Sequence, residues 1–180
     1  PTEDFNNDIG PIISKEAFYK LKGYIERASI YGRNIIQAQN YIDDKYVPPT
    51  IIEIESLSEL ESEQFGPILH LMKFKSGNVQ GVVEEINKLN YGLTLGVHTR
   101  VESRADEIAN AANVGNVYIN RDIVGAVVGV QPFGGEGLSG TGCKAGGPNY
   151  LSQFVNEQVV SKNVVAFGGN TELLNLQTEK

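Results

Sequence analysis

The stretch that decides the fold begins at Pro67-Ile68-Leu69-His70-Leu71-Met72-Lys73-Phe74, an apolar run with the length of a buried strand. Apolar residues at helical spacing predict a helix over 79–89, and strand-like sequence follows at 93–99. A second helix is predicted over 101–113 and a further strand over 114–120. Strands that alternate with helices at this spacing predict an α/β layered fold with a mostly parallel sheet.

The sequence before this stretch predicts further elements of the same kind. Ser14 is a helix cap, and the amphipathic helix that follows it is expected to end near Gly32. Residues 35–38 are predicted to form a short strand. Residues 46–54 are predicted to form another, whose prolines favour a sheet edge or the beginning of a strand. A helical turn is expected at 58–63.

After residue 120 the pattern changes. Residues 124–148 are rich in glycine and lack apolar periodicity, and a loop of this length is uncommon unless it is functional. Gly135 to Gly140 match the spacing G-x-G-x-x-G, but no strand is predicted before them and no helix after them, so a dinucleotide-binding motif is disfavoured. A short helix is predicted at 150–154, and residues 159–167 have strand propensity.

The composition is that of a globular protein. The 180 residues include 41% hydrophobic and 21% charged residues, enough for one domain or one domain with an appendage. With 15 basic and 22 acidic residues the net charge is −7, which disfavours binding to nucleic acid through phosphate contacts. No apolar run has the roughly 18 residues of a membrane span, and the N-terminus has no signal-peptide pattern. We therefore expect a cytoplasmic protein with no transmembrane segment.

Two further features concern completeness and metal binding. The only methionine is Met72, so we expect the chain to be a piece of a longer protein.

Cys143 is the single cysteine, which excludes an intrachain disulfide and a cysteine-based zinc site. His70 and His98 are the only histidines, and both are interpreted as packed residues of apolar strands rather than as bases. No metal site is expected.

The segment Glu63-Gln64-Phe65-Gly66-Pro67 carries more chemical information. A carboxylate accepts two hydrogen bonds from a vicinal diol such as a ribose, and an aromatic ring gives a flat cofactor a packing surface. On these residues alone, a helix-terminal Glu63 and a core Phe65 remain the more frequent interpretation.

This segment resembles the Glu-x-Phe-Gly-Pro motif of NAD(P)-dependent aldehyde dehydrogenases. Three other motifs of that family follow in the same order, and they are Tyr91-Gly92-Leu93-Thr94, Gly115 to Asn120 and Pro132-Phe133-Gly134-Gly135. Residues 120–148 closely resemble the L-glutamate γ-semialdehyde (Δ1-pyrroline-5-carboxylate) dehydrogenases of this family. The best match is the version within the bifunctional proline-utilisation (PutA) proteins.

The resemblance implies a three-layer catalytic domain, with a mostly parallel sheet, helices on both faces, and its N-terminal side missing. Residues 1–156 would be the C-terminal portion of that domain, and residues 157–180 an oligomerisation strand and tail. In the family a cysteine attacks the aldehyde, hydride passes to NAD+, and a glutamate-activated water hydrolyses the thioester. Those residues and the dinucleotide domain would precede Pro1. The chain would therefore contain no catalytic residue and would be inactive alone.

The resemblance also implies roles for six residues. The expected cofactor-binding residues are Glu63, Phe65 and Leu93, and the cofactor is NAD. FAD is expected only if a proline dehydrogenase domain precedes the chain. The expected substrate-binding residues are Gly125 and Ala126, whose backbone N–H groups would hold the α-carboxylate of L-glutamate γ-semialdehyde, and Phe133, which would line the aldehyde tunnel. Cys143 stands where relatives often have proline.

Two alternatives stay open. The first is a free-standing, non-catalytic domain with the same fold, which would self-associate through the apolar segment 159–167. A homo-oligomer through this C-terminal strand is also expected for the dehydrogenase. The second alternative is a small Rossmann oxidoreductase that binds NAD+ by itself.

Overall fold

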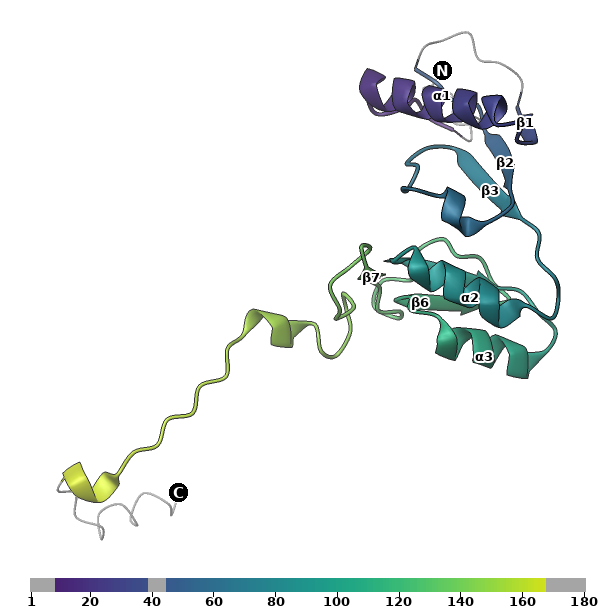
Figure 1. The fold of residues 1–180 in the computed structure, drawn as a ribbon. Coiled ribbons are helices and arrows are strands. Elements are labelled where there is room, and N and C mark those ends of the chain that lie inside the picture. The colour runs from purple at the N-terminus through teal and green to yellow at the C-terminus, as the bar shows by residue number, and fades with distance from the viewer. Residues whose placement is uncertain (1–8, 39–44, 168–180) are drawn as a thin grey trace.

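A computed structural model describes residues 9–38 and 45–167 of the chain (Figure 1). Its elements comprise three α-helices, seven strands and three short 3-10 helices. The helices are α1 (Lys15–Ile30), α2 (Val79–Lys88) and α3 (Glu102–Ala111), and the 3-10 helices are η1 (Leu57–Glu59), η2 (Leu151–Phe154) and η3 (Val164–Phe167). The strands are β1 (Ile35–Gln37), β2 (Thr50–Ile54), β3 (Ile68–Met72), β4 (Tyr91–Gly92), β5 (Thr94–Val97), β6 (Asn116–Ile119) and β7 (Glu136–Gly137).

The first helix follows its sequence prediction at both ends. The Ser14 side chain accepts a hydrogen bond from the backbone N–H of Ala17 at 3.1 Å, which satisfies one donor of the first turn. The helix ends at Ile30, and Gly32 takes a φ of 72°, which a glycine adopts without steric cost. Leu21 is buried and packs against Gly66, so α1 covers the chain just before β3.

The first sheet has the order β1-β2-β3, with β1 antiparallel to β2 and β2 parallel to β3. β2 is the central strand, so the prolines before it mark the beginning of a strand and the predicted edge position is wrong. Thr50, Ile52 and Ile54 alternate along β2 and are all buried. The Thr50 hydroxyl donates to the carbonyl of Pro48 at 2.8 Å, which makes burial of this polar group favourable.

The strand β3 lies at the edge of this sheet, and the prediction of a buried strand is only half correct. Leu69 is 60% exposed and Leu71 47% exposed, while His70 between them is half-buried. Successive side chains of a strand point to opposite faces, so only the face that meets α1 is covered.

The second half of the fold pairs β5 with β6 in parallel and places α2 and α3 in contact with each other. Val83 of α2 and Ala105 of α3 are its buried helix residues. The α/β class and the parallel order of β2–β3 and β5–β6 are confirmed. The sheet is divided, however, because β3 and β5 belong to separate sheets although α2 connects them. Among the described residues, each helix is too short or too polar to cross a bilayer.

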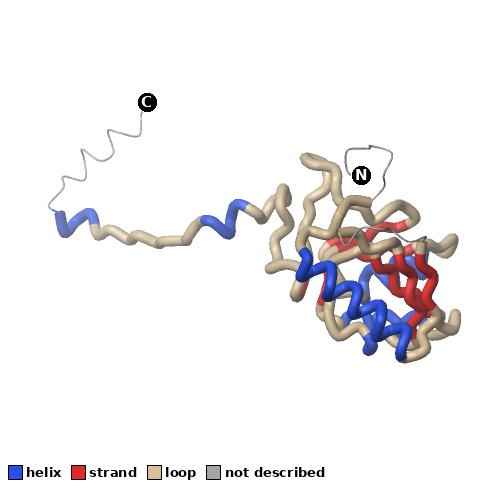
Figure 2. Tube along the Cα trace, turned by 90° about the horizontal axis from the view of Figure 1, so that it is seen from above, coloured by secondary structure: helices blue, strands red, loops and turns tan. Residues whose placement is uncertain are grey.

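The glycine-rich loop and the C-terminal segment contain little regular structure. Between 124 and 148 the chain forms only β7 and a single bridge between Phe133 and Ala145. Beyond η2, residues 155–163 are exposed and extend away from the body of the fold (Figure 2). Within this single chain the segment predicted as a strand at 159–167 pairs with no other strand, and its last residues form η3. Residues 168–180 of the predicted tail lie outside the described residues.

The approach of Gly134 to Gly115 gives the first prediction. A Cβ at Gly115 would overlap the carbonyl oxygen of Gly134, and the nearest atoms are all backbone. We expect Gly115→Ala to lower the free energy of unfolding by about 1–3 kcal/mol, measured by urea denaturation. Gly77→Ala is the control, because nothing lies within 4 Å of a Cβ there. Equal stability of the two variants would contradict the close packing.

Candidate functional site

The segment around Glu63 forms a loop between η1 and β3. The loop is anchored by a capping box, in which the Glu59 carboxylate accepts from the Ser56 N–H at 3.1 Å and the Ser56 hydroxyl caps the turn. Phe65 is 82% exposed, so its interpretation as a core residue is wrong. Glu63 is exposed and makes no hydrogen bond or ion pair with the described residues. Both side chains are thus free to contact a ligand.

A cavity of about 250 Å³ lies beside this loop. Its lining residues come from the loop, from β3 and from the segment at the beginning of β4, and they are Leu60, Ser62, Glu63, Gln64, Ile68, His70, Leu89 and Tyr91. The structure therefore brings Glu63 close to Tyr91. Leu93, which is 43% exposed, lies two residues beyond Tyr91, but neither Leu93 nor Phe65 lines the cavity.

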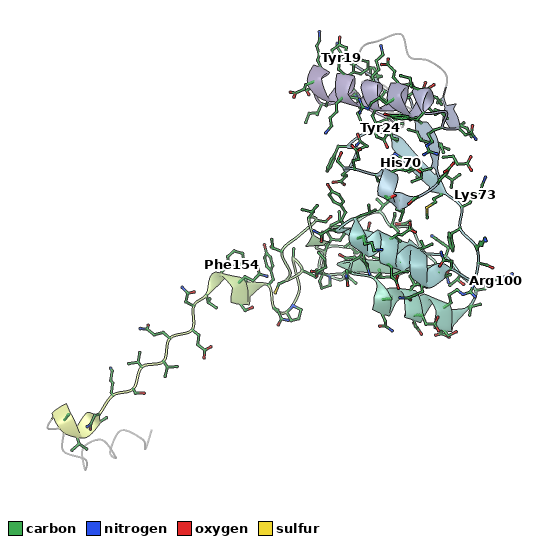
Figure 3. The ribbon with its side chains drawn as sticks, in the orientation of Figure 1. Tyr19, Tyr24, His70, Lys73, Arg100 and Phe154 are labelled. Atoms are coloured by element: carbon green, nitrogen blue, oxygen red, sulfur yellow. The ribbon has the colours of Figure 1, made fainter. Side chains whose placement is uncertain are left out.

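The two histidines differ from each other. His70 contacts α1, where its Nε2 atom lies 2.7 Å from the Tyr24 hydroxyl and the rings meet edge to face (Figure 3). Burial lowers the pKa of His70 from its usual 6.5, and burial raises the pKa of Tyr24, with the charge of Glu59 as a smaller cause. The packed interpretation is confirmed for His70 and wrong for His98, which is exposed.

The expected substrate residues Gly125 and Ala126 lie between a bend at Val124 and the turn at 128–130. The N–H of Val124 donates to the Asp122 carboxylate at 3.2 Å, and the N–H of Val127 donates to the Gln131 side chain at 3.1 Å. The N–H groups of Gly125 and Ala126, between them, have no partner within the described residues. Gly125 has a φ of 60° and nothing within 4 Å of a Cβ. Two adjacent backbone donors without a partner are available to bind an anion.

Side chains of β6 hold this loop in place. The Tyr118 hydroxyl donates to the carbonyl of Gly125 at 2.8 Å. The Asn116 amide donates to the carbonyl of Pro132 at 3.0 Å and accepts from the N–H of Gly134 at 3.1 Å. These bonds flank Phe133, which also pairs through its backbone with Ala145. Phe133 is thereby fixed as a partly exposed apolar side chain.

Asn116 and Tyr118 were not among the residues predicted to form the site. The signal that could have identified them is polar residues at every second position of an apolar strand, at 116, 118 and 120. Since strand residues two apart share a face, this spacing places Asn116 and Tyr118 toward the same loop, whereas Asn120, beyond the strand, bonds to Thr99.

The glycine motif at 135–140 does not form a phosphate-binding turn. Glu136 and Gly137 form β7, which pairs antiparallel with β4, and no helix begins directly after the motif. This geometry overturns the Rossmann alternative for this segment. Cys143 is exposed in the same loop. Within 9–38 and 45–167, no group of three His, Cys, Asp or Glu side chains is arranged to hold a metal ion.

Comparisons with known proteins agree with one another. Residues 1–160 match the sequence profile described as "Aldehyde dehydrogenase family". The chain is 48% identical over 159 residues to "Bifunctional protein PutA" of Klebsiella aerogenes, covering 84% of this chain and 12% of that protein. It is 38% identical over 162 residues to "1-pyrroline-5-carboxylate dehydrogenase" of Staphylococcus haemolyticus, covering 87% and 31%. The chain thus spans a small part of these curated relatives.

Solved structures give the same result. A crystal structure of a Proline Utilization A (PutA) variant from Bradyrhizobium japonicum superposes with a TM-score of 0.79 at 44% identity, covering 88% of this chain and 16% of that one. A variant of 1-pyrroline-5-carboxylate dehydrogenase from Thermus thermophilus gives 0.72 at 35% identity, covering 83% and 29%.

The environment of His70 predicts a pH dependence of stability. Because the folded pKa lies below 6.5, the unfolded chain binds the proton more tightly. The contribution of His70 is complete above pH 6.5 and is lost as the pH falls from 6.5 through the folded pKa. We expect His70→Gln to reduce the decline in unfolding free energy between pH 7.5 and 5.5, measured by urea denaturation. His98→Gln is the control and should decline as the wild type does; identical profiles for all three proteins would refute the burial argument.

Proposed function

Because the chain belongs to the aldehyde dehydrogenase family, we propose that it is part of an enzyme that oxidises L-glutamate γ-semialdehyde to L-glutamate with NAD+ in proline catabolism. One observation carries the choice of substrate: the adjacent unpaired N–H groups of Gly125 and Ala126. This substrate has a carboxylate at the end opposite its aldehyde, and an anion of that kind can accept hydrogen bonds from two adjacent unpaired backbone donors. The similarity to PutA and 1-pyrroline-5-carboxylate dehydrogenases supports the same choice.

In this proposal the substrate is held at both ends of its carbon chain. The α-carboxylate accepts hydrogen bonds from Gly125 and Ala126. Phe133, fixed between the bonds that Asn116 makes, supplies an apolar wall for the methylene groups near the aldehyde. Anchoring the far end of a substrate restricts the positions that its reactive end can adopt, which favours reaction at one place.

The exposed pair Glu63 and Phe65 fits a nicotinamide dinucleotide. The Glu63 carboxylate has free acceptor positions for a ribose diol, and the exposed Phe65 ring offers a packing surface for a flat group. Leu93 completes the proposed cofactor contacts. When bound, the nicotinamide accepts the hydride that leaves the aldehyde carbon. FAD would be needed only by a proline dehydrogenase segment elsewhere in the protein.

We further propose that the chain depends on other parts of a longer protein for activity, including the nucleophilic cysteine. The divided sheet supports this, because β3 and β5 lie on either side of α2 in the chain and belong to separate sheets. A strand from another part of the protein could join the two sheets. We also propose that the protein is cytoplasmic, as its sequence leads us to expect.

Residues 157–180 are proposed to add a strand to a second subunit. The exposed, extended course of 155–163, with exposed Val155, Val159 and Val160, supports this role. The same feature favours the alternative of a non-catalytic self-association domain. The two functions differ in whether the full-length protein oxidises the semialdehyde.

The substrate anchor is tested by Gly125→Val in the full-length protein. A β-branched residue at a φ of 60° is strained, so the turn should deform and lose its paired donors. We expect the KM for the semialdehyde to rise about 10-fold or more. The KM for butanal, which lacks the amino and carboxylate groups, should change little. Val128→Ala, at a 96% exposed neighbour, should leave both values unchanged. Unaltered semialdehyde kinetics in Gly125→Val would refute the anchor.

The cofactor contact is tested by Glu63→Gln. Replacing the carboxylate by an amide removes charged acceptors for the ribose diol, so the KM for NAD+ should rise by about 10-fold. Glu61→Gln removes a similar exposed charge two residues away and should have no such effect. Steady-state kinetics with varied NAD+ measures both. If the KM for NAD+ changes equally in both variants, the change comes from the loss of negative charge and not from a contact between Glu63 and the ribose.

A further inference from the structure

We propose that Tyr118 is a positioning residue for substrate recognition, because its hydroxyl orients the peptide unit that presents the Ala126 N–H. Tyr118 lies in β6, is 6% exposed, and donates to the Gly125 carbonyl at 2.8 Å. This inference rests on the proposed function of the loop as a carboxylate anchor. The inference assigns a role in substrate recognition to Tyr118, which does not itself contact the substrate.

The argument begins with the geometry of one peptide unit. The Gly125 carbonyl and the Ala126 N–H belong to the same planar group, and the peptide bond that joins these residues is trans. In a trans peptide these two bonds point in opposite directions. Binding the carbonyl to the buried Tyr118 hydroxyl therefore directs the Ala126 N–H away from β6. The direction of this donor is set by a side chain eight residues earlier in the chain.

Few other groups of this loop can orient the peptide between Gly125 and Ala126. The neighbouring donors of Val124 and Val127 are already bonded to Asp122 and Gln131. No side chain lies near the Cα hydrogens of Gly125, which has only open space within 4 Å of a Cβ. Without the phenol, the peptide between 125 and 126 could rotate, since glycine permits many backbone conformations. Among the described residues, Tyr118 is the side chain that restrains the carbonyl.

Arg121 strengthens the same arrangement. Its guanidinium lies 4.6 Å from the centre of the Tyr118 ring, a distance typical of a cation–π contact. Asp122 is 3.9 Å from the guanidinium, so the charge is only partly compensated. The contact covers one face of the ring and places a positive charge beside the loop. A positive charge there favours the approach of a carboxylate.

The test is Tyr118→Phe in the full-length protein, with L-glutamate γ-semialdehyde and butanal as substrates. The variant loses one hydroxyl and keeps the ring that Arg121 contacts. We expect the KM for the semialdehyde to rise about 3- to 10-fold with kcat little changed, because one hydrogen bond is lost. The KM for butanal should stay constant. The dissociation constant of L-glutamate, measured by calorimetry, should rise by the same factor.

Tyr24→Phe is the matched control. It removes another partly buried phenol hydrogen bond, to His70 at 2.7 Å, outside the loop. A merely structural role of Tyr118 would give both variants lower stability and the same KM values. If the wild type prefers the semialdehyde and Tyr118→Phe keeps that preference, the positioning role is wrong and the proposed function stands. If the wild type does not distinguish the two aldehydes, the proposed function is wrong, and this inference with it.

Discussion

The row of side chains on one face of β6 is the interaction on which the rest of the site depends. Asn116 and Tyr118 lie two residues apart and bond to backbone groups of the loop that follows. Asn120, directly after β6, bonds instead to both backbone groups of Thr99 at 2.9 Å. A loop with almost no secondary structure of its own is in this way held by two strand-spaced side chains, Asn116 and Tyr118. The loop conformation is thus a consequence of the strand's period of two.

The position directly before β6, residue 115, is also restricted to glycine by the loop that packs against it. Gly115 lies so close to Gly134 that no Cβ could be accommodated without moving backbone. The loop can bend back to this point because Gly115 lacks a side chain. The close packing at Gly115 and the hydrogen bond from Tyr118 therefore hold the same loop against the same part of the fold. The parallel pairing of β5 and β6 supports it, since it fixes β6 from its other side.

The sequence allowed prediction of those features that depend on local chemistry. The Ser14 cap, the amphipathic helices and the strand at β6 each follow from spacing and propensity, and each is present. The features that depend on which elements pack against one another could not be predicted from the sequence. Leu69 and Leu71 have the composition of buried residues, yet β3 is an edge strand here. The strand predicted at 159–167 lacks a neighbour, so its apolar residues remain exposed. For the site, the motif indicated Glu63 and Gly125, whereas the role of Tyr118 required the contact across the loop.

A crystal structure of the full-length protein with L-glutamate bound tests the central claim most directly. The account predicts that one carboxylate of the ligand lies within about 3.2 Å of the backbone nitrogens of Gly125 and Ala126. The Tyr118 hydroxyl should still bond to the Gly125 carbonyl in that complex. A ligand whose carboxylates are held by side chains elsewhere, with both nitrogens facing solvent, would contradict it.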